Sequence, residues 1–592
     1  MSDVSDPPET TAVTFCATLL DEWVRAGVSD VVLAPGSRST PMVLALAAEP
    51  RLRMHVHHDE RSAGFVALGL GVATGRPAVV LTTSGTAAVE LHPAVVEAHE
   101  ARVPLIVCTA DRPPELHGVG APQTIDQQQL FGRSVCWFAD PGVPDAATSS
   151  TWRPLAAEAY NRAVRGPGRP AGPVHCNLAF REPLVGEVGT LPPGRDGGRP
   201  WEQPVVQADA LPVDSLDALA AGLAGRRGII VAGAGIDDPA AVMALGRAAG
   251  WPVLADPRSG CRIPTESTIS HADALLRVPE VADRLRPEVV LRLGALPASK
   301  VLGQWLAGLE VWQVAIEADG ARFDPDRCLD ALIAAEPGAA AAVLADHLPG
   351  GPVPDAPAGA ESWAGAWAHA DAVAAEAIAS ALAGQSEPCE PAVARDVVRA
   401  LPEGSTLVVS SSMPVRDVEW FAVPRTGLRV LANRGANGID GVLSTAVGVA
   451  LAAPAASTGS GKAATAVLLG DVAFLYDANG LLGAASRGID LTVVVVDNDG
   501  GGIFSFLPPA GFLPADVFER LYGTPHGVDL VGLAAAHGIS SRVIDRQVDL
   551  APAVEESAAL GGVHVLIVCT DRAANVAIHD DLNAAVAQAL AP

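Results

Sequence analysis

The sequence predicts an α/β protein made of three doubly wound parallel-sheet domains. Two observations support this class. Short runs of consecutive aliphatic and β-branched residues recur along the chain, and longer helical stretches separate them. Continuous apolar strands are typical of parallel sheets, because helices cover both faces of such a sheet. The length of 592 residues exceeds what one hydrophobic core supports, which favours several domains.

Two segments rich in proline and glycine divide the chain. Residues 186–212 separate an expected first domain, residues 1–190, from an expected central domain, residues 205–345. A second such connector precedes the expected last domain, residues 363–592. The predicted strands are, in chain order, residues 30–35, 78–84, 104–110, 228–235, 252–257, 289–295, 406–412, 429–435, 464–471, 491–498 and 563–570.

Composition and charge narrow the class of function. The formal net charge of −27 argues against nucleic acid or an anionic membrane as partner, because both require a basic surface. No apolar run is long enough to span a bilayer, and the acidic, polar amino terminus differs from a secretory signal. The eight cysteines are scattered without a CxxC pair, which predicts neither a disulfide framework nor a zinc site. We therefore expect a cytoplasmic enzyme that acts on small molecules. We expect its cysteines to be small buried residues.

Polar residues and glycines gather where the strand at 491–498 ends. The stretch VVVVDNDGGGIFSFL passes from four valines into Asp497, Asn498, Asp499 and three glycines. Ligands bind beyond the carboxyl ends of strands in open α/β sheets, and glycine lets the backbone approach them. Asp471 follows the preceding strand, 27 positions before Asn498, so one βαβ unit should bring both residues to one sheet edge. Such oxygen ligands suit Mg²⁺ bound to a diphosphate, whereas Asp497 and Asp499 are expected to be turn acids.

Two other phosphate-binding motifs are incomplete. Residues 231–238 resemble a dinucleotide turn but lack its third glycine, so an NAD-dependent oxidoreductase is a minor alternative. Residues 456–465 resemble a phosphate loop, but Ala456 and Ala463 replace the first glycine and the hydroxyl residue. We expect the second stretch to be a surface loop.

The spacing of Gly470, Asp471 and Asn498 resembles the motif of thiamine-diphosphate enzymes, although that motif normally begins GDG and Val472 replaces its last glycine here. One branch of the superfamily also lacks this glycine: the 2-succinyl-5-enolpyruvyl-6-hydroxy-3-cyclohexene-1-carboxylate synthases of menaquinone biosynthesis. Further blocks resemble that family in the same order, namely APGSRSTP (34–41), HHDERSAGF (57–65), TTSGTAA (82–88), QTIDQ (123–127), SSMPVRD (411–417), NRGANGIDG (433–441) and DNDGGGIFSFLP (497–508).

The resemblance implies thiamine diphosphate and Mg²⁺ (or Mn²⁺) as cofactors, with Asp471, Asn498 and the Gly500 carbonyl holding the metal. Glu60 is implied as the catalytic carboxylate that contacts the aminopyrimidine ring of the cofactor, in an apolar setting that favours a protonated acid. A helix-start acid stabilised by the helix dipole is the alternative for this residue. Further cofactor contacts are implied for Ser412, Met413, Gly470, Gly502 and Ile503. In the family, Glu60 and Asp471 would come from different subunits, so we expect a homodimer or a dimer of dimers.

The resemblance also implies a transferase that decarboxylates 2-oxoglutarate and adds the succinyl unit to isochorismate. Both substrates are dianions, and arginine binds carboxylates well. Ser412, Arg416 and Arg434 match family positions for the first substrate. Ser37, Arg38, Gln123 and Lys300 match positions for the second, and Ile439 is also placed at the substrate site.

Two alternatives within the superfamily remain open from the sequence. Another 2-oxo acid carboligase, such as an acetohydroxyacid synthase, would be expected to carry the complete GDG and would not need a pair of arginines for a distal carboxylate. A thiamine-diphosphate sensor without activity would need no Glu60.

Overall fold

The computed structural model describes the chain except for residues 1–9, 167, 204–210, 349–361, 454–461 and 592. Most of the stretch that resembles a phosphate loop lies outside the described residues. The chain groups into two compact units. Unit 1 consists of Met1–Gln207, Asn433–Ala455 and Ala473–Ile489, and unit 2 consists of Ala208–Ala432, Ala456–Val472 and Asp490–Pro592.

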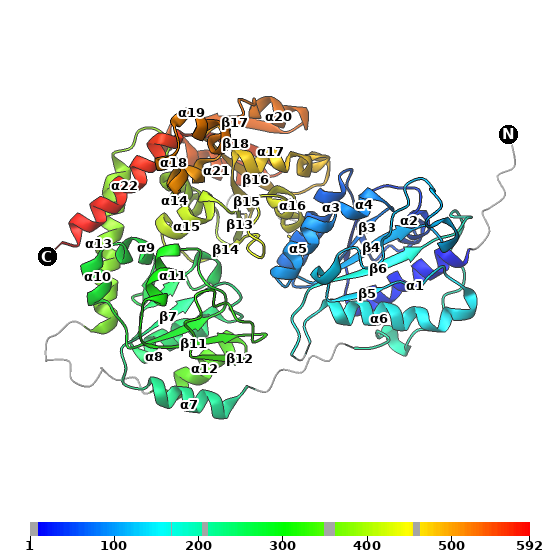
Figure 1. Cartoon of the computed structure of the whole chain (residues 1–592), viewed down its shortest axis with the longest axis horizontal. Helices are drawn as coiled ribbons and strands as arrows, with labels where there is room; N and C mark the ends of the chain where they lie inside the picture. The colour runs from blue at the N-terminus through cyan, green and yellow to red at the C-terminus, as the bar shows by residue number, and fades with distance from the viewer. Residues whose placement is uncertain (1–9, 167, 204–210, 349–361, 454–461, 592) are drawn as a thin grey trace. The chain divides into compact units, whose positions relative to one another are not determined.

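The first sheet lies in unit 1. Its six parallel strands are β1 (Asp30–Leu33), β2 (Arg53–Val56), β3 (Ala78–Thr82), β4 (Leu105–Asp111), β5 (Trp137–Ala139) and β6 (Pro173–Ala179). Its helices are α1 (Thr11–Ala26), α2 (Thr40–Ala47), α3 (Glu60–Thr74), α4 (Thr86–Val89), α5 (His92–Glu100) and α6 (Trp152–Ala163), and Figure 1 shows α1 and α6 on one face and α3 and α5 on the other. The strand order β2-β1-β3-β4-β6-β5 reverses direction between β1 and β3.

The second sheet lies in unit 2. Its parallel strands are β7 (Gly228–Ala232), β8 (Val253–Ala255), β9 (Thr268–Ile269), β10 (Val289–Leu293), β11 (Trp312–Glu317) and β12 (Ala331–Ala334), in the order β12-β11-β10-β7-β8-β9. The helices along this part of the chain are α7 (Val213–Leu223), α8 (Pro239–Ala249), α9 (Ala272–Leu276), α10 (Pro279–Arg284), α11 (Lys300–Ala307), α12 (Pro337–His347) and α13 (Trp363–Ala383).

The third sheet also lies in unit 2 and repeats the strand order of the first. Its parallel strands are β13 (Ser405–Val409), β14 (Leu428–Leu431), β15 (Thr465–Gly470), β16 (Leu491–Asp497), β17 (Ser540–Ile544) and β18 (Val563–Cys569), in the order β14-β13-β15-β16-β18-β17. The helices are α14 (Glu390–Ala400), α15 (Met413–Phe421), α16 (Val442–Ala452), α17 (Asp471–Tyr476), α18 (Pro508–Phe512), α19 (Ala515–Phe518), α20 (Leu530–Ala536), α21 (Gln547–Leu560) and α22 (Arg572–Ala589). The predicted class of three doubly wound parallel-sheet domains is confirmed.

Helix α16 belongs to unit 1, where it packs against α3. The two helices cross at glycines. A Cβ atom on Gly69 would lie 2.1 Å from the carbonyl oxygen of Thr445, and one on Gly448 would lie 2.1 Å from that of Val66. Only glycine allows the two backbones to approach so closely. This crossing fixes α3, the helix whose first residue is Glu60.

All eight cysteines are free, but the expectation that they are buried is wrong for three of them. Cys569 is exposed at the end of β18, the strand next to the edge strand β17. Cys136 and Cys328 are half-buried. None of the described helices combines the length and the hydropathy that a membrane crossing requires.

Candidate functional site

In each of the three sheets, the winding direction of the chain reverses between two neighbouring strands. The three reversal points differ in the atoms that lie next to them. In doubly wound sheets, ligands bind outside the carboxyl ends of the strands at such a point. In the second sheet the point lies between β7 and β10, and a Cβ atom on Gly233 would lie 1.4 Å from the carbonyl oxygen of Ala295. The backbones after β7 and β10 therefore approach closely at this point, and no side chain fits at Gly233; the alternative of a dinucleotide at residues 231–238 stays a prediction from the sequence.

In the third sheet the reversal lies between β13 and β15, and open space adjoins it. A Cβ atom on Gly470, the last residue of β15, would meet no atom within 4 Å. Ser412 follows β13 in a left-handed backbone conformation, with φ of 76°, and precedes the first turn of α15. Met413 is buried at the start of α15. The Nη1 atom of Arg416, one turn further along the helix, donates to the carbonyl oxygen of Ser412.

Asp471 organises the backbone beyond β15 and β16. Its Oδ2 atom accepts hydrogen bonds from the backbone N–H groups of Gly500 at 2.8 Å and Asn498 at 3.2 Å, and its Oδ1 atom accepts from Val472 at 2.7 Å. The side chain is buried, and burial raises the pKa of Asp471 despite these hydrogen bonds. A cation next to the carboxylate would favour its charged form, so the position suits a metal ligand.

One side of the Asn498 amide makes a hydrogen bond, and the other side has none among the described residues. Its Nδ2 atom donates to Oε1 of Glu390 at 2.8 Å. Its Oδ1 atom is buried and has no hydrogen-bond partner among the described residues. A buried polar oxygen without a partner costs free energy, and a metal ion would satisfy it. The Gly500 carbonyl accepts the N–H of Gly502 at 2.9 Å and retains a second lone pair. The residues present therefore fit the predicted metal.

Close approaches explain the three glycines after Asn498. Gly500 has φ of 138°, and a Cβ atom there would lie 2.0 Å from the carbonyl oxygen of Gly523. A Cβ atom on Gly502 would lie 2.5 Å from Nδ2 of Asn498. Side chains at these positions would displace the loop or the amide. Ile503, the next residue, is half-buried in a short 3₁₀ helix.

Three further side chains adjoin this edge. The Oδ1 atom of Asp499 accepts the backbone N–H groups of His526 at 2.9 Å and Gly527 at 2.8 Å, and Asp497 accepts the N–H of Asp499 at 3.2 Å. Asp497 therefore acts in a local turn, whereas Asp499 holds the distant backbone at 526–527, a contact that the expected turn role did not include. Sequence reasoning missed His526, whose Nε2 atom lies 3.2 Å from Oδ2 of Asp471. Potential ligand atoms of Asp471, Asp497 and His526 lie within 4.8 Å of one another.

Glu390 belongs to a cluster of buried titratable groups. It begins α14, and its exposed fraction is 4%. Burial and the nearby Asp417 raise the pKa of Glu390 to about 7. Asp417 in turn lies 2.7 Å from Nε2 of His579. Nothing in the local sequence marks Glu390 as part of the site.

Glu60 is the first residue of α3 in unit 1 and is half-buried. The preceding residue, Asp59, caps the helix by accepting the N–H of Ser62 at 3.1 Å, and it also accepts Nδ2 of Asn479 at 2.6 Å. Glu60 therefore lies at a helix start, as the alternative interpretation requires, and the apolar helix expected behind it is present. Its catalytic role stays a prediction.

The loop that carries Arg434 and Ile439 is held by a buried acid of unit 1. Glu97, on α5, accepts the backbone N–H groups of Gly435 at 2.8 Å and Ala436 at 2.7 Å. Burial raises the pKa of Glu97. A pocket of about 380 Å³ adjoins this loop and is lined by Phe65, His92, Pro93, Val96, Glu97, Asn433, Ala436, Gly438 and Asp440.

A second group of predicted residues lies where the first sheet reverses, between β1 and β3. Ser37 is exposed and Arg38 is half-buried after β1, where Nη1 of Arg38 donates to the carbonyl oxygen of Phe180 at 3.0 Å. Gln123 donates through Nε2 to the carbonyl oxygen of Ser84 at 3.1 Å. Gln123 also has φ of 56°, a conformation uncommon for residues other than glycine. Hydrogen bonds to backbone carbonyls therefore hold Arg38 and Gln123 in place.

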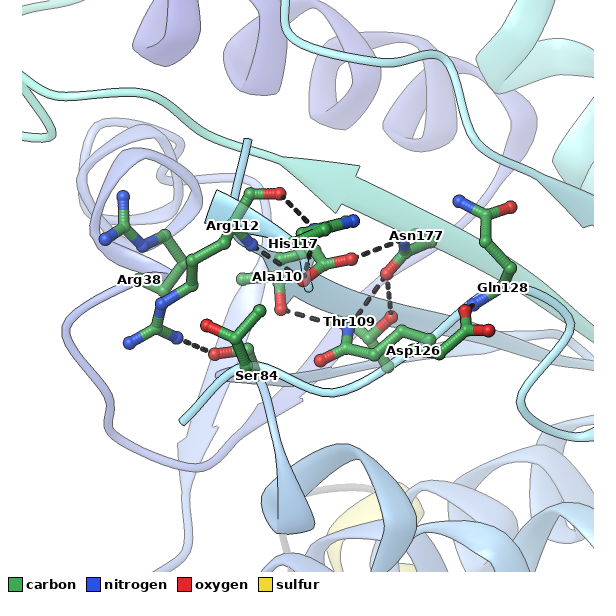
Figure 2. Close-up of polar contacts among 12 residues, drawn as sticks. Arg38, Ser84, Thr109, Ala110, Arg112, His117, Asp126, Gln128 and Asn177 are labelled. Carbon is green, nitrogen blue, oxygen red and sulfur yellow. Dashed lines mark hydrogen bonds and ion pairs between the residues drawn. The ribbon is translucent and has the colours of Figure 1, made fainter. Parts of the chain in front are cut away.

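Arg112 joins this group and was missed in the sequence. Its Nη1 atom donates to Oγ of Ser84, and Figure 2 shows its guanidinium group on the same side of the network as that of Arg38. Burial and the neighbouring Arg38 lower the pKa of Arg112. Two partly buried cations this close favour an anion between them. Arg112 lies two residues after the predicted strand 104–110, so the strand-end reasoning used for Asp471 would have drawn attention to it.

A network of buried hydrogen bonds lies next to these side chains (Figure 2). Asn177, on β6, donates through Nδ2 to Asp111 at 2.9 Å and accepts through Oδ1 from Thr109 and from Gln127, each at 2.9 Å. Gln127 also accepts the N–H of Gly85 at 2.9 Å. The network connects the carboxyl ends of β3, β4 and β6 and so fixes the loops that carry Ser84, Arg112 and Gln123.

The structure assigns the predicted residues to two units. Unit 2 contains Lys300, which is exposed at the first residue of α11 after the capping residue Ser299. It also brings together Ser412, Met413, Arg416, Gly470, Asp471, Asn498, Gly500, Gly502 and Ile503. Unit 1 contains Ser37, Arg38, Glu60, Gln123, Arg434 and Ile439.

Comparisons with known proteins agree with the predicted superfamily. Three family models match in succession: the N-terminal TPP binding domain of thiamine pyrophosphate enzymes at residues 14–130, the middle domain of thiamine pyrophosphate at 198–409, and the C-terminal TPP binding domain of these enzymes at 419–568.

Curated relatives match almost the whole chain. Proteins named 2-succinyl-5-enolpyruvyl-6-hydroxy-3-cyclohexene-1-carboxylate synthase from Chloroflexus aurantiacus, Geobacillus kaustophilus and Myxococcus xanthus are 42%, 40% and 42% identical to it. The matches cover 98%, 95% and 98% of this chain and 98%, 96% and 98% of the relatives. Among solved structures, a Mycobacterium smegmatis protein assigned to the thiamin diphosphate-dependent enzymes matches with a TM-score of 0.69 over 94% of this chain and 99% of its own. At 18% identity, this likeness shows the fold alone.

Proposed function

Because the chain belongs to the family of 2-succinyl-5-enolpyruvyl-6-hydroxy-3-cyclohexene-1-carboxylate synthases, we propose that it decarboxylates 2-oxoglutarate and transfers the succinyl unit to isochorismate in menaquinone biosynthesis. The observation that carries the proposal is the match of 42% identity over 98% of the chain. The polar carboxyl edges of the first and third sheets support it, because they offer the oxygen ligands and cations that this reaction requires.

The first part of the proposal concerns the cofactors. When bound, thiamine diphosphate supplies the carbon nucleophile and the electron sink that decarboxylation requires. Asp471, Asn498 and the Gly500 carbonyl would hold Mg²⁺ (or Mn²⁺), whose preference for oxygen ligands they match. The unpartnered Oδ1 atom of Asn498 supports this assignment. Ser412, Met413, Gly470, Gly502 and Ile503 would line the rest of the cofactor site, next to the open space at Gly470.

Glu60 would move the proton that starts the reaction. A carboxyl group at the start of an apolar helix can exchange a proton with the aminopyrimidine ring of the cofactor. The tight crossing of α3 and α16 supports this role, because it fixes the helix that presents Glu60.

The arginines would divide between the two substrates. Arg416 and Arg434, with Ser412, would bind the carboxylates of 2-oxoglutarate. Ser37, Arg38, Gln123 and Lys300 would bind isochorismate, and we add Arg112 to this second group because it neighbours Arg38. Charge-assisted contacts from arginine suit dianionic substrates. Ile439 would pack against substrate from the loop that Glu97 holds.

The remaining expectations follow the family. We propose a homodimer or a dimer of dimers in which each cofactor site takes Glu60 and Asp471 from different subunits, in the cytoplasm. The domain bounds that we propose are 1–190 for the pyrimidine-binding domain, 205–345 for the central domain and 363–592 for the diphosphate- and metal-binding domain. An acetohydroxyacid synthase activity is disfavoured, because the relatives carry the synthase name and Val472 breaks the GDG motif.

Product analysis tests the proposed function. The protein is incubated with thiamine diphosphate, Mg²⁺ and 2-oxoglutarate, with and without isochorismate, and the products are identified by mass. We expect the adduct of isochorismate with a succinyl unit, together with release of CO₂. A product formed from pyruvate in place of 2-oxoglutarate would support the acetohydroxyacid synthase alternative instead.

A further inference from the structure

The orientation of the Asn498 amide determines whether this residue can bind a metal. An asparagine amide presents an acceptor oxygen on one side and a donor nitrogen on the other. Only the oxygen can coordinate a cation. In the structure Oδ1 is the atom without a partner, and Nδ2 makes the hydrogen bond to Glu390 at 2.8 Å. The side chain is therefore already turned in the orientation that metal binding requires.

Glu390 is the group that distinguishes the two orientations. Rotating the amide by 180° would place Oδ1 against Oε1 of Glu390, two acceptor oxygens in a buried region, and would leave Nδ2 facing the metal. An ionised carboxylate only accepts hydrogen bonds, so Glu390 favours the orientation in which Nδ2 faces it. The backbone N–H of Asn498 is held separately by Asp471 at 3.2 Å, and Glu390 therefore acts on the side chain.

The surroundings fix both partners of this hydrogen bond. Glu390 begins α14 and is followed by Pro391, so its backbone is constrained, and its exposed fraction is only 4%. A Cβ atom on Gly502 would lie 2.5 Å from Nδ2 of Asn498, the atom that donates to Glu390. The absence of a side chain at Gly502 gives the amide room to reach Glu390.

We propose that Glu390 is a positioning residue for the divalent metal, which holds the Asn498 amide so that Oδ1 faces the metal site. The inference rests on the proposed function, because it takes Asn498 as a metal ligand. Glu390 itself does not touch the metal in this arrangement. It acts as a second layer behind the ligand, and removal of such partners commonly weakens metal binding by about 10- to 100-fold.

Metal affinity, measured without turnover, tests the proposal. Mn²⁺ is titrated into the full-length protein in the presence of thiamine diphosphate, and free Mn²⁺ is followed by electron paramagnetic resonance. Glu390→Met keeps the length of the side chain but removes the acceptor, so we expect the Kd for Mn²⁺ to rise about 10- to 100-fold. Glu390→Gln can accept from Nδ2 through its oxygen or donate to Oδ1 through its nitrogen, so it no longer selects one orientation, and its Kd for Mn²⁺ should lie between those of the wild type and Glu390→Met. If the Kd of Glu390→Met equals that of the wild type, the inference is wrong.

A double variant separates positioning from general damage to the fold. Asn498→Ala should weaken Mn²⁺ binding, and adding Glu390→Met to it should cause no further loss, because both changes remove the same ligand. A further loss in the double variant would overturn the proposal. If Glu390→Met does not fold, Glu390→Asp replaces it: the shorter side chain loses contact with Nδ2, and the Kd should rise as well.

The same series distinguishes this inference from the proposed function. Unchanged Mn²⁺ affinity in Asn498→Ala would remove Asn498 from the metal site, and the inference would fail together with that assignment. Weakened affinity in Asn498→Ala but not in Glu390→Met or Glu390→Asp would overturn only the role of Glu390.

Discussion

Replacing Glu419 with glutamine should remove a pH-dependent loss of stability from unit 2. Glu419 lies on α15, one turn beyond Arg416, and its exposed fraction is 8%. Its Oε1 atom accepts the backbone N–H of Ser299 at 3.2 Å, and its Oε2 atom is buried without a partner among the described residues. This contact connects α15 to Ser299, the residue that caps α11. Lys300 is the first residue of α11.

Burial, with the nearby Asp256 and Asp273, raises the pKa of Glu419 to about 8, although Arg258 and Arg262 oppose the shift. In the unfolded chain the pKa is close to 4.5. Because the folded state favours the protonated form, the stabilising contribution is complete below about pH 4.5 and is lost as the pH rises towards 8. A shift of this size corresponds to at most about 5 kcal/mol.

Glutamine keeps the acceptor oxygen for Ser299 and cannot ionise. The free energy of unfolding of Glu419→Gln should therefore equal that of the wild type near pH 5 and exceed it progressively, by up to a few kcal/mol, towards pH 9. Thermal and urea unfolding across this range measure the difference. The exposed Glu555 provides a matched control, since Glu555→Gln should give curves parallel to those of the wild type. Parallel curves for Glu419→Gln as well would refute the reasoning.

Three further predictions concern the site. Thiamine diphosphate and Mg²⁺ together should raise the Tm of the wild type, since ligand at about 100 times its Kd stabilises the folded state by about 2.7 kcal/mol. Asp471→Ala should abolish this Tm shift. An unchanged shift in the variant would remove Asp471 from the metal site. Glu60→Gln should fold normally but lower turnover by about 10²- to 10⁴-fold, which steady-state kinetics would contradict if turnover stayed near wild type. Arg416→Ala should slow CO₂ release from 2-oxoglutarate alone by about 10- to 150-fold, whereas Arg38→Ala should lose activity only when isochorismate is added. The opposite pattern in single-turnover mixing would refute this division.

Most interior strands could be predicted from the sequence, although β6 and β11 were missed, whereas most edge strands could not. β16 reads as an uninterrupted apolar run because it is buried on both faces. β2, at an edge, contains Arg53 and His55 and is largely exposed, so it carries no such pattern. β6 is buried but escaped prediction because it includes His175 and Asn177, which take part in a buried hydrogen-bond network through Nε2 of His175 and the amide of Asn177.

The candidate site divides in the same way. Asp471 and Asn498 could be paired from the sequence, because the order of one βαβ unit places the ends of neighbouring strands together. Glu390 could not, because it is 108 residues from Asn498 and no local pattern connects the start of a helix to a strand end so distant in the chain. Likewise, Glu97 meets Gly435 across 338 residues. Groups that orient a ligand are defined by tertiary packing, which a single sequence does not reveal.

The closed reversal point of the second sheet bears on how that sheet contributes to the proposed site. The loops after β7 and β10 are hydrogen-bonded to each other, with the N–H of Ala295 donating to the carbonyl oxygen of Ala234 at 2.9 Å. No side chain fits at Gly233 or Gly294, where a Cβ atom would lie within 2.3 Å of backbone oxygen. These positions therefore accept no side chain, in contrast to Gly470, where a Cβ atom would meet no atom within 4 Å. In the proposed function, the substrate contact expected from this sheet comes from further along the loop after β10, where Lys300 begins α11.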